Sequence, residues 1–327
     1  MRRFLVTVLI FILILSGVTV SVNALYVRRD HSDKYGTDKF LSMPETIAVC
    51  NFGSSHGLNG FNYSDLEQQG ISCFNFAMTS QFISYDLRLL EQYGDRLAEG
   101  AIVLIPVSYF SLFGLPETEY EEFEGKNRRY YRVLDPARIK SYEPMMDLYV
   151  NHFPSLVAAS NLVPVLLGKS TPADTRWAIC TEPSKAAVSA EAAAQRHIVE
   201  NKYDGEGHRI INEEEVGALI SMIEYCKELH TRPVPLTTPY LREYQDAVRD
   251  RDEDFFTDFM EIMNRVSGET GCRYLDYSGD ERFAGEYELF SDADHLNREG
   301  ARVFTDLLMK EISGQEANIT EEAGSGR

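Results

Sequence analysis

Five short apolar runs, separated by segments with helical periodicity, constrain the fold of this chain more than any other feature of its sequence. Runs of this length, bounded by polar or turn-forming residues, are typical of strands buried on both faces of a sheet. The runs occupy residues 47–51, 72–76, 101–107, 233–238 and 272–277. Apolar residues recur at helical spacing in residues 85–99, 212–230, 254–266 and 297–312. This alternation predicts an α/β fold, a doubly wound, flavodoxin-like parallel sheet of about five strands.

One long segment interrupts this rhythm. Residues 115–207 are much longer than a strand-to-helix connection and mix helical, aromatic and charged stretches. We expect a cap-like helical insertion there, with helices over residues 154–167 and 184–199. The insertion either shapes a substrate pocket or is a peripheral elaboration, and the sequence leaves both open. After a domain spanning residues 46–313, residues 314–327 lack periodicity and predict a flexible tail.

The N-terminus predicts export from the cytoplasm. Residues 4–20 carry no charge and follow Arg2 and Arg3, as in a signal peptide or a short membrane anchor. The apolar run is long for a cleaved signal, so we expect residues 1–25 to be a retained anchor, residues 26–45 a stalk, and the domain extracytoplasmic. Cleavage near Ala24 and secretion is the alternative. Basic residues after the segment outnumber those before it, which taken alone opposes this orientation.

Charge and cysteine content exclude or disfavour several functions. The formal net charge of −19 disfavours nucleic acid as a partner, because phosphate backbones are bound by clustered Lys and Arg. The five cysteines have neither zinc-site spacing nor the density of a disulfide scaffold. We interpret Cys50, Cys73 and Cys272, which lie in apolar runs, as small buried hydrophobic residues. Neither a cofactor nor a metal is expected.

Two polar motifs lie where strands of such a sheet end. Residues 52–57, FGSSHG, directly follow the first apolar run, and residues 292–297, DADHLN, precede the last helix. Taken singly, the first is an ordinary strand-to-helix turn and the second an ordinary helix N-terminus. Because functional side chains of open α/β sheets gather at the carboxyl ends of the strands, we expect the two motifs to converge there.

The residue types in these motifs suit nucleophilic catalysis. A serine hydroxyl needs a base within hydrogen-bond reach, and the base needs a group that fixes its tautomer. Ser55 and His295 supply the nucleophile and the base, and Asp292, three residues before His295, can reach Nδ1 while Nε2 faces the serine. We expect Asp294, adjacent to His295, to point elsewhere. The motif could also hold a divalent ion, but no second ligand cluster is evident in the sequence.

Apart from the insertion, residues 46–312 resemble the SGNH or GDSL hydrolase superfamily of esterases and acyltransferases. Gly53-Ser54-Ser55 aligns with the Gly-Asp-Ser motif of that superfamily, and Asp292-x-x-His295 with its closing Asp-x-x-His. The Gly-Ser-Ser form, joined to an N-terminal membrane segment, resembles especially the membrane-anchored branch that includes the teichoic acid D-alanylation and alginate acetylation proteins. The resemblance implies an SGNH fold and an extracytoplasmic O-acyltransferase or esterase. Its substrate is then an acylated cell-surface glycan or a small acyl ester, with a multi-spanning membrane O-acyltransferase as a candidate partner.

The resemblance also locates the donors that stabilise an oxyanion. Where the superfamily has a Gly after the second strand and an Asn after the third, this chain has Ser80 and either Ser108 or Tyr109. Ser80 can offer its backbone N–H, as Ser55 can, and Ser108 or Tyr109 a hydroxyl. Losing one donor outright costs about 2.7–4 kcal/mol of transition-state stabilisation. These departures from the superfamily pattern are compatible with a slow, specific transferase and with a non-catalytic adaptor.

The remaining histidines have less definite roles. His56 lines the acyl pocket, bonds the acceptor or caps the following helix, and we favour the structural role. His152, His197, His208 and His230 are scattered through polar or helical stretches, so we interpret them as ordinary surface or packed histidines.

Overall fold

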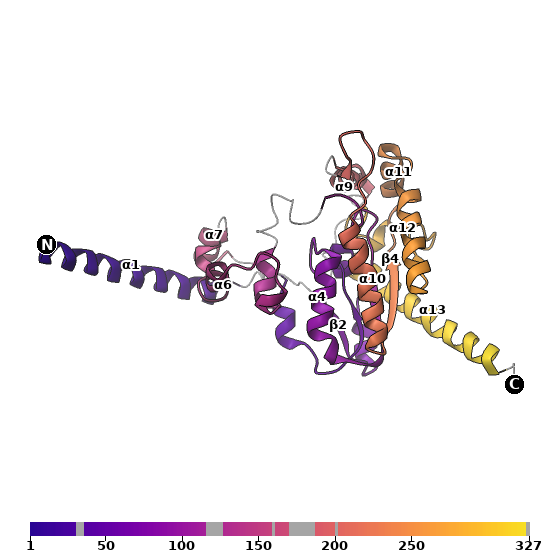
Figure 1. Ribbon diagram of the computed structural model, residues 1–327, viewed down its shortest axis with the longest axis horizontal. Helices are drawn as coiled ribbons and strands as arrows, with labels where there is room; N and C mark the ends of the chain where they lie inside the picture. The colour runs from indigo at the N-terminus through magenta and orange to yellow at the C-terminus, as the bar shows by residue number, and fades with distance from the viewer. Residues whose placement is uncertain (31–35, 116–126, 159–160, 170–186, 200–201, 325–327) are drawn as a thin grey trace. The chain divides into compact units, whose positions relative to one another are not determined.

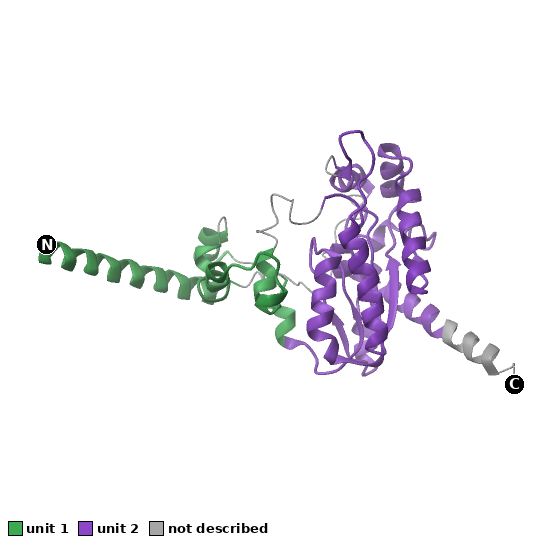
Figure 2. Cartoon of the chain, viewed as in Figure 1, with its two compact units in different colours: residues 1–41, 121–175 green, residues 42–120, 176–327 purple. Residues whose placement is uncertain are grey.

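A computed structural model describes residues 1–30, 36–115, 127–158, 161–169, 187–199 and 202–324 (Figure 1). The chain divides into two compact units, residues 1–41 with 121–175 and residues 42–120 with 176–327 (Figure 2). The predicted insertion at residues 115–207 is therefore shared between the two units. Cys180 and the start of the helix expected at 184–199 lie outside the described residues.

The larger unit contains a parallel sheet with the strand order β2-β1-β3-β4-β5. The strands are β1 Ile47–Asn51, β2 Cys73–Asn75, β3 Leu97–Pro106, β4 Arg232–Thr237 and β5 Leu275–Asp276. The chain leaves β1 for β2 on one side and then returns to β3 on the other, so the strand order reverses between β1 and β3. This order confirms the predicted doubly wound, flavodoxin-like sheet. Ligand-binding crevices of such sheets lie at the carboxyl ends of the strands flanking the reversal.

All five predicted strands are present, but their ends differ from the prediction. The helix expected over residues 85–99 is α4 (Ile83–Tyr93), and β3 already begins at Leu97. Leu97 keeps the helical spacing of the preceding leucines, so periodicity alone could not locate the end of the helix. The last strand, expected over residues 272–277, is reduced to Leu275–Asp276.

Two groups of helices cover the sheet. Helix α10 (Glu213–Glu228) contacts α4 and α12 (Phe255–Thr270), and α12 contacts α11 (Arg242–Arg251). Helix α13 (Arg298–Gly324) contacts α2 (Ser55–Gly60) and α3 (Ser64–Gln68). Right-handed crossovers in this strand order place the two groups on opposite faces of the sheet. Both groups contribute buried side chains, including Leu219, Phe259 and Phe304, and α10 contacts β4.

Helix α13 continues to Gly324, past the predicted end at residue 312. The Gly and Ser content of residues 313–327 predicts a tail, but Glu and Ala between them are good helix formers.

The smaller unit begins with α1 (Arg2–Arg29), whose most apolar 18-residue window has a mean hydropathy of 2.7. By length and composition this helix can cross a membrane, and it fits a signal anchor or a signal peptide. The unit also contains α6 (Pro144–His152), η6 (Pro154–Leu156) and α7 (Leu162–Leu166). The single helix expected over residues 154–167 is thus divided into two short ones. Shorter 3₁₀ segments are η1 (Asp38–Ser42), η4 (Arg128–Arg132) and η5 (Pro136–Arg138).

Candidate active site

A tight turn after β1 presents Ser55 at the edge of the sheet. Ser55 is the first residue of α2, so its backbone N–H has no acceptor within the helix. Gly53 has φ +105°, a backbone conformation that residues with a side chain rarely adopt. A Cβ at this position would lie 3.2 Å from the carbonyl oxygen of Pro106. A Cβ on Gly57 would lie 2.1 Å from the carbonyl oxygen of Phe52. The two glycines therefore allow the close approach of strand and helix that positions Ser55.

The buried carboxylate of Asp86, on α4, stabilises this turn by hydrogen bonds. Its Oδ1 accepts hydrogen bonds from the backbone N–H of Gly53 at 2.8 Å and from Nε2 of Gln81 at 2.5 Å. Burial raises the pKa of Asp86 to about 7, although both hydrogen bonds oppose the shift. The turn that carries Ser55 is thus attached to a titratable group.

The second motif forms a compact loop before α13. The backbone N–H of His295 donates to Oδ1 of Asp292 at 2.8 Å, and that of Asp294 donates to the same oxygen at 3.2 Å. At the start of α13, Oδ1 of Asn297 accepts from the backbone N–H groups of Glu299 and Gly300, both at 3.0 Å. Short polar side chains favour such local hydrogen bonds, and they fix the loop that carries His295.

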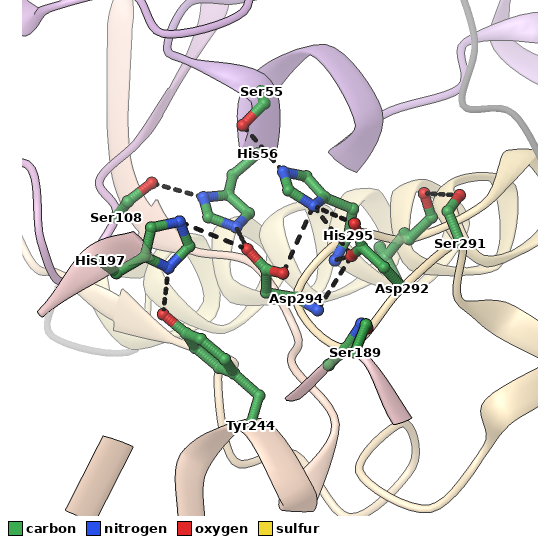
Figure 3. A network of polar contacts seen from close by, with 12 residues as sticks. Ser55, His56, Ser108, Ser189, His197, Tyr244, Ser291, Asp292, Asp294 and His295 are labelled. Carbon is green, nitrogen blue, oxygen red and sulfur yellow. Dashed lines mark hydrogen bonds and ion pairs between the residues drawn. The ribbon is translucent and has the colours of Figure 1, made fainter. Parts of the chain in front are cut away.

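The two motifs meet in a line of hydrogen bonds (Figure 3). Nε2 of His295 lies 2.8 Å from Oγ of Ser55, and Nδ1 of His295 lies 2.9 Å from Oδ1 of Asp292. Burial lowers the pKa of His295, but the negative charges of Asp294 and Asp292 outweigh burial and raise it above the ordinary value. The structure therefore brings together the three side chains that the sequence singled out, from positions 240 residues apart.

A second line of hydrogen bonds lies beside the first. Oγ of Ser108, just beyond β3, lies 2.7 Å from Nδ1 of His56, and Nε2 of His56 lies 3.1 Å from Oδ2 of Asp294. The rings of His56 and His295 are stacked, with centroids 4.5 Å apart and planes 15° apart. Figure 3 shows Ser55 and Ser108 on one side of the stacked rings and Asp292 and Asp294 on the other. The side chains of the second line are all buried.

His197, on α9 (Ala190–His197), also joins this cluster. Its Nε2 lies 3.8 Å from Oδ2 of Asp294, its Nδ1 lies 2.8 Å from the hydroxyl of Tyr244, and its ring stacks on Phe110 with centroids 3.8 Å apart. Burial lowers the pKa of His197 to about 3 and also lowers that of His56, so both rings are neutral at pH 7. The sequence predicted a surface or packed histidine at this position, and His197 is packed, but no motif near it in the sequence indicates its place beside Asp294.

The expectation that Asp294 points elsewhere was wrong. Asp294 faces the cluster because the loop folds back around Oδ1 of Asp292, and this turns the neighbouring side chain inward. Another contact the sequence did not indicate is made by Ser189, whose Oγ accepts a hydrogen bond from the backbone N–H of Ala293 at 2.8 Å.

The expected oxyanion donors lie in different places. Ser80 is exposed and has φ 55°, so this serine adopts a backbone conformation that favours glycine. The hydroxyl of Ser108 is bonded to His56. Tyr109 is buried against Tyr240, Phe256 and Phe259. The ring of Tyr109 thus packs in an aromatic cluster, and among the described residues no hydrogen bond joins its hydroxyl to Ser55.

His56 is neither a helix cap nor an exposed pocket residue. It lies at the second position of α2, which has no side-chain cap, and it is 2% exposed. The capping role favoured from the sequence is thus not observed, and the side chain instead forms a buried link between Ser108 and Asp294.

His56, Asp294 and His295 offer ligand atoms that lie within 4.8 Å of one another. Two imidazoles and a carboxylate form a donor set suited to divalent transition metals. Both ring nitrogens of His295 and of His56 already have hydrogen-bond partners, however, so a metal would have to displace one of them.

The fold and this cluster define an α/β protein with a serine–histidine–aspartate array at the carboxyl edge of a parallel sheet. No protein-family model matches the chain, and no curated protein sequence matches it. Among solved structures, the chain is similar to a Bacteroides fragilis protein described as a "putative acylhydrolase", with 12% sequence identity and a TM-score of 0.39. The match covers 85% of this chain and 94% of that protein.

Proposed function

We propose that this chain is a serine esterase or O-acyltransferase that acts outside the cytoplasmic membrane. Ser55 is the nucleophile, His295 the general base and Asp292 the carboxylate that orients the base. One observation carries the proposal: an unbroken line of hydrogen bonds joins Ser55 Oγ, the His295 ring and Asp292, with distances of 2.8 and 2.9 Å. This is the arrangement that converts a weakly nucleophilic hydroxyl into a nucleophile at neutral pH.

The acylation step follows from this arrangement. Oγ of Ser55 attacks the carbonyl carbon of an ester while Nε2 of His295 takes the hydroxyl proton, and the developing imidazolium is stabilised by Asp292. When the carbonyl re-forms, the bond to the alcohol breaks, and His295 returns the proton to the departing oxygen. The products are an acyl-Ser55 ester and a free alcohol.

In the second step another hydroxyl accepts the acyl group. His295 removes the proton of this hydroxyl, its oxygen attacks the acyl-Ser55 carbonyl, and the proton then returns to Oγ of Ser55. Water as acceptor makes the reaction ester hydrolysis, and a sugar hydroxyl makes it acyl transfer.

Two backbone N–H groups are the proposed oxyanion donors. The N–H of Ser55 lies at the free N-terminus of α2, where the helix dipole also favours negative charge. The left-handed backbone of Ser80 supports the second donor, because non-glycine residues held at positive φ concentrate at functional sites. The Ser108 hydroxyl hydrogen is directed toward His56, so the proposed site has one donor fewer than expected, and we expect a slow enzyme.

The localisation supports an ester of the cell envelope as substrate. Asn23, near the end of α1, donates from Nδ2 to the carbonyl oxygen of His152 at 2.8 Å and accepts from N and Oγ of Ser155 at 3.2 and 2.9 Å. Cleavage after Ala24 would remove all three bonds. We therefore propose that α1 is a retained anchor, and that the substrate is an acylated cell-surface glycan or a small acyl ester. A multi-spanning membrane O-acyltransferase is the proposed partner.

Covalent labelling tests the proposed nucleophile. A serine-directed fluorophosphonate should label the wild-type chain at Ser55 and should not label Ser55→Ala, and hydrolysis of a chromogenic acetyl ester should be lost with Ser55→Ala and with His295→Gln. Ser54→Ala is the matched control, and it should keep both labelling and hydrolysis. A folded wild-type chain without any adduct would instead support a non-catalytic adaptor that binds an acylated polymer or a membrane acyltransferase.

The N-terminal sequence of the membrane-bound protein tests the anchor. A chain that begins at Met1 or Arg2 supports retention, whereas a terminus at Leu25 would show that the segment is cleaved.

A further inference from the structure

We propose that His295 works with two carboxylates: Asp292 orients its ring, and Asp294, held by His56, supplies most of the negative charge that stabilises the imidazolium. His56 is then a positioning residue, which acts through Asp294 and through its own stacked ring. This inference rests on the proposed function of Ser55 and His295, and it assigns to the second hydrogen-bonded line a role in the same site.

The two carboxylates differ in burial. The side chain of Asp294 is fully buried, whereas that of Asp292 is 34% exposed. Water screens the charge of a partly exposed carboxylate, while a buried charge acts over the same distance at a lower effective dielectric constant. Asp294 therefore stabilises a positive charge on His295 more strongly than Asp292 does, although its nearer oxygen is 3.6 Å from Nδ1 rather than 2.9 Å.

One oxygen of Asp294 points to the same conclusion. Oδ1 is buried and has no hydrogen-bond partner among the described residues, and it is this oxygen that lies 3.6 Å from Nδ1 of His295. Leaving a buried carboxylate oxygen without a partner costs free energy. A transient imidazolium beside it offsets that cost at the moment when proton transfer from Ser55 places the charge on His295.

His56 holds Asp294 without neutralising it. The ionised carboxylate only accepts hydrogen bonds, so Nε2 of His56 carries the hydrogen, and Nδ1 accepts the hydroxyl hydrogen of Ser108. Burial keeps His56 neutral, because it lowers the pKa of the ring. The negative charge of Asp294 thus remains available to His295.

Other charged and titratable groups also face His295. The neutral rings of His56, on α2, and His197, on α9, flank the cluster. Arg196, also on α9, lowers the pKa of His295, and Asp292 and Asp294, on the loop before α13, raise it. Among the described residues, Asp292 and Asp294 are thus the anionic groups that raise the pKa of His295.

Titration of His295 by NMR, in protein with isotope-labelled histidine, separates the two carboxylates. We expect Asp294→Asn to lower the pKa of His295 further than Asp292→Asn does. The acidic limb of the pH profile of kcat/KM should move to lower pH by the same amount, since the base must be neutral. On the plateau, kcat of Asp294→Asn should fall by about tenfold or more, the loss that corresponds to one pKa unit of imidazolium stabilisation. The inference is overturned if only Asp292→Asn moves the titration.

Variants of His56 test the positioning role in case Asp294→Asn does not fold. His56→Gln keeps an amide N–H for Asp294 and should largely preserve the His295 titration, whereas His56→Ala should shift it and lower kcat more than it changes KM. Equal behaviour of the two variants contradicts the role. The NMR measurement does not require activity, so a protein inactive on every ester would disprove the proposed function while the titration still tests the electrostatic role of Asp294.

A separate observation in the smaller unit leads us to infer that a surface beside α1 lies in the membrane interface. We call α6, η6 and α7 the collar. Tyr26 of α1 is buried with Ala158 and Val165, and Leu162 and Leu166 pack against them. Arg29 donates a hydrogen bond to the carbonyl oxygen of Leu166. The collar is thus fixed to the last turns of the proposed anchor by an apolar cluster and by side-chain hydrogen bonds.

Several apolar side chains on or next to the collar are exposed. Met145 on α6, Leu156 in η6 and Val163 on α7 are 57%, 54% and 62% exposed, and Leu167, directly after α7, is 65% exposed. Keeping apolar surface in water costs roughly 25 cal/mol per Å², and a group of such side chains indicates a contact surface. Because the collar is attached to a helix that can cross a membrane and whose own apolar side chains are exposed, the lipid interface is the occupant we infer.

Tryptophan fluorescence of the full chain in nanodiscs tests the collar. Starting from Trp177→Phe, which removes the single tryptophan, Val163→Trp should be quenched by lipids brominated near the headgroup. Leu13→Trp, within α1, should be quenched by lipids brominated deep in the acyl chains and reports insertion of the anchor. If Leu13→Trp is quenched and Val163→Trp is not, the collar is not in the interface. If neither is quenched, the proposed anchor itself is wrong.

Discussion

At the scale of single residues, Gly57 sets how closely α2 approaches the end of β1. A Cβ at this position would lie 2.1 Å from the carbonyl oxygen of Phe52, which is backbone and cannot rotate away. Gly57→Ala should therefore lower the free energy of unfolding by about 1–3 kcal/mol or more. It should also displace Ser55, two residues earlier.

Gly217 provides the matched control for this substitution. It lies exposed within α10 and has nothing within 4 Å of an added Cβ, so Gly217→Ala should raise the free energy of unfolding by roughly 0.5–1 kcal/mol. Urea denaturation of both variants measures the difference. Similar effects for the two alanines would contradict the close approach at Gly57.

Asp86 couples the Ser55 turn to pH. Its pKa is about 7 in the folded protein, above the ordinary value of 3.8, so between these values the native state binds a proton that the unfolded state has released. Its contribution to stability is fully present below pH 3.8 and is lost as the pH rises through about 7. Asp86→Asn imitates the protonated acid. The free energy of unfolding of this variant, relative to wild type, should therefore increase from pH 5 to pH 8 by up to a few kcal/mol. Denaturant unfolding at both pH values tests this, and an unchanged difference between variant and wild type would refute it.

At the scale of elements, one side chain starts the helix that covers the middle of the sheet. Oδ1 of Asn212 accepts from the backbone N–H of Glu215 at 3.3 Å, and its Nδ2 donates to the carbonyl oxygen of Leu115 at 3.1 Å. Asn212→Ala removes both bonds and should lower the free energy of unfolding by about 1–2 kcal/mol.

Asn212→Asp keeps the cap and loses only the donor to Leu115, so it should cost less than alanine. Thermal unfolding of the three proteins measures the order, and an alanine variant as stable as wild type would show that the cap contributes little to the stability of α10.

The elements near the site were predictable from the sequence to different extents. The strands that carry the motifs were predicted from apolar runs, because a strand buried on both faces needs apolar side chains at every position. The boundary between α4 and β3 was not predicted correctly, since leucines continue across it at helical spacing. Local hydrogen bonds of Asp292 could be anticipated from its spacing to His295, but the inward turn of Asp294 depends on how the whole loop folds.

At the scale of the whole molecule, buried thiols report global unfolding. Cys50 and Cys226 are fully buried, and burial raises the pKa of Cys226 to about 12 and that of Cys50 well above its usual value. Only the thiolate reacts, so in a Cys180→Ser background both should resist iodoacetamide in the native state and react when denaturant unfolds the protein. Labelling of either thiol in the native state at the rate of a free cysteine would show that the sheet core opens without global unfolding.

The class of fold, the apolar N-terminal helix and the three side chains of the Ser55 array could be predicted from the amino-acid sequence, because they depend on hydrophobic periodicity and on two short motifs. The tertiary structure was needed to show that Ser108, His56 and Asp294 form a buried second line beside that array, with His197 next to Asp294. These four residues come from α2, α9, the end of β3 and the loop before α13, and no local pattern in the sequence relates them. Their contact exists because the sheet brings the carboxyl ends of separate strands to one edge, and burial there gives their charges and hydrogen bonds a strength they lack in water.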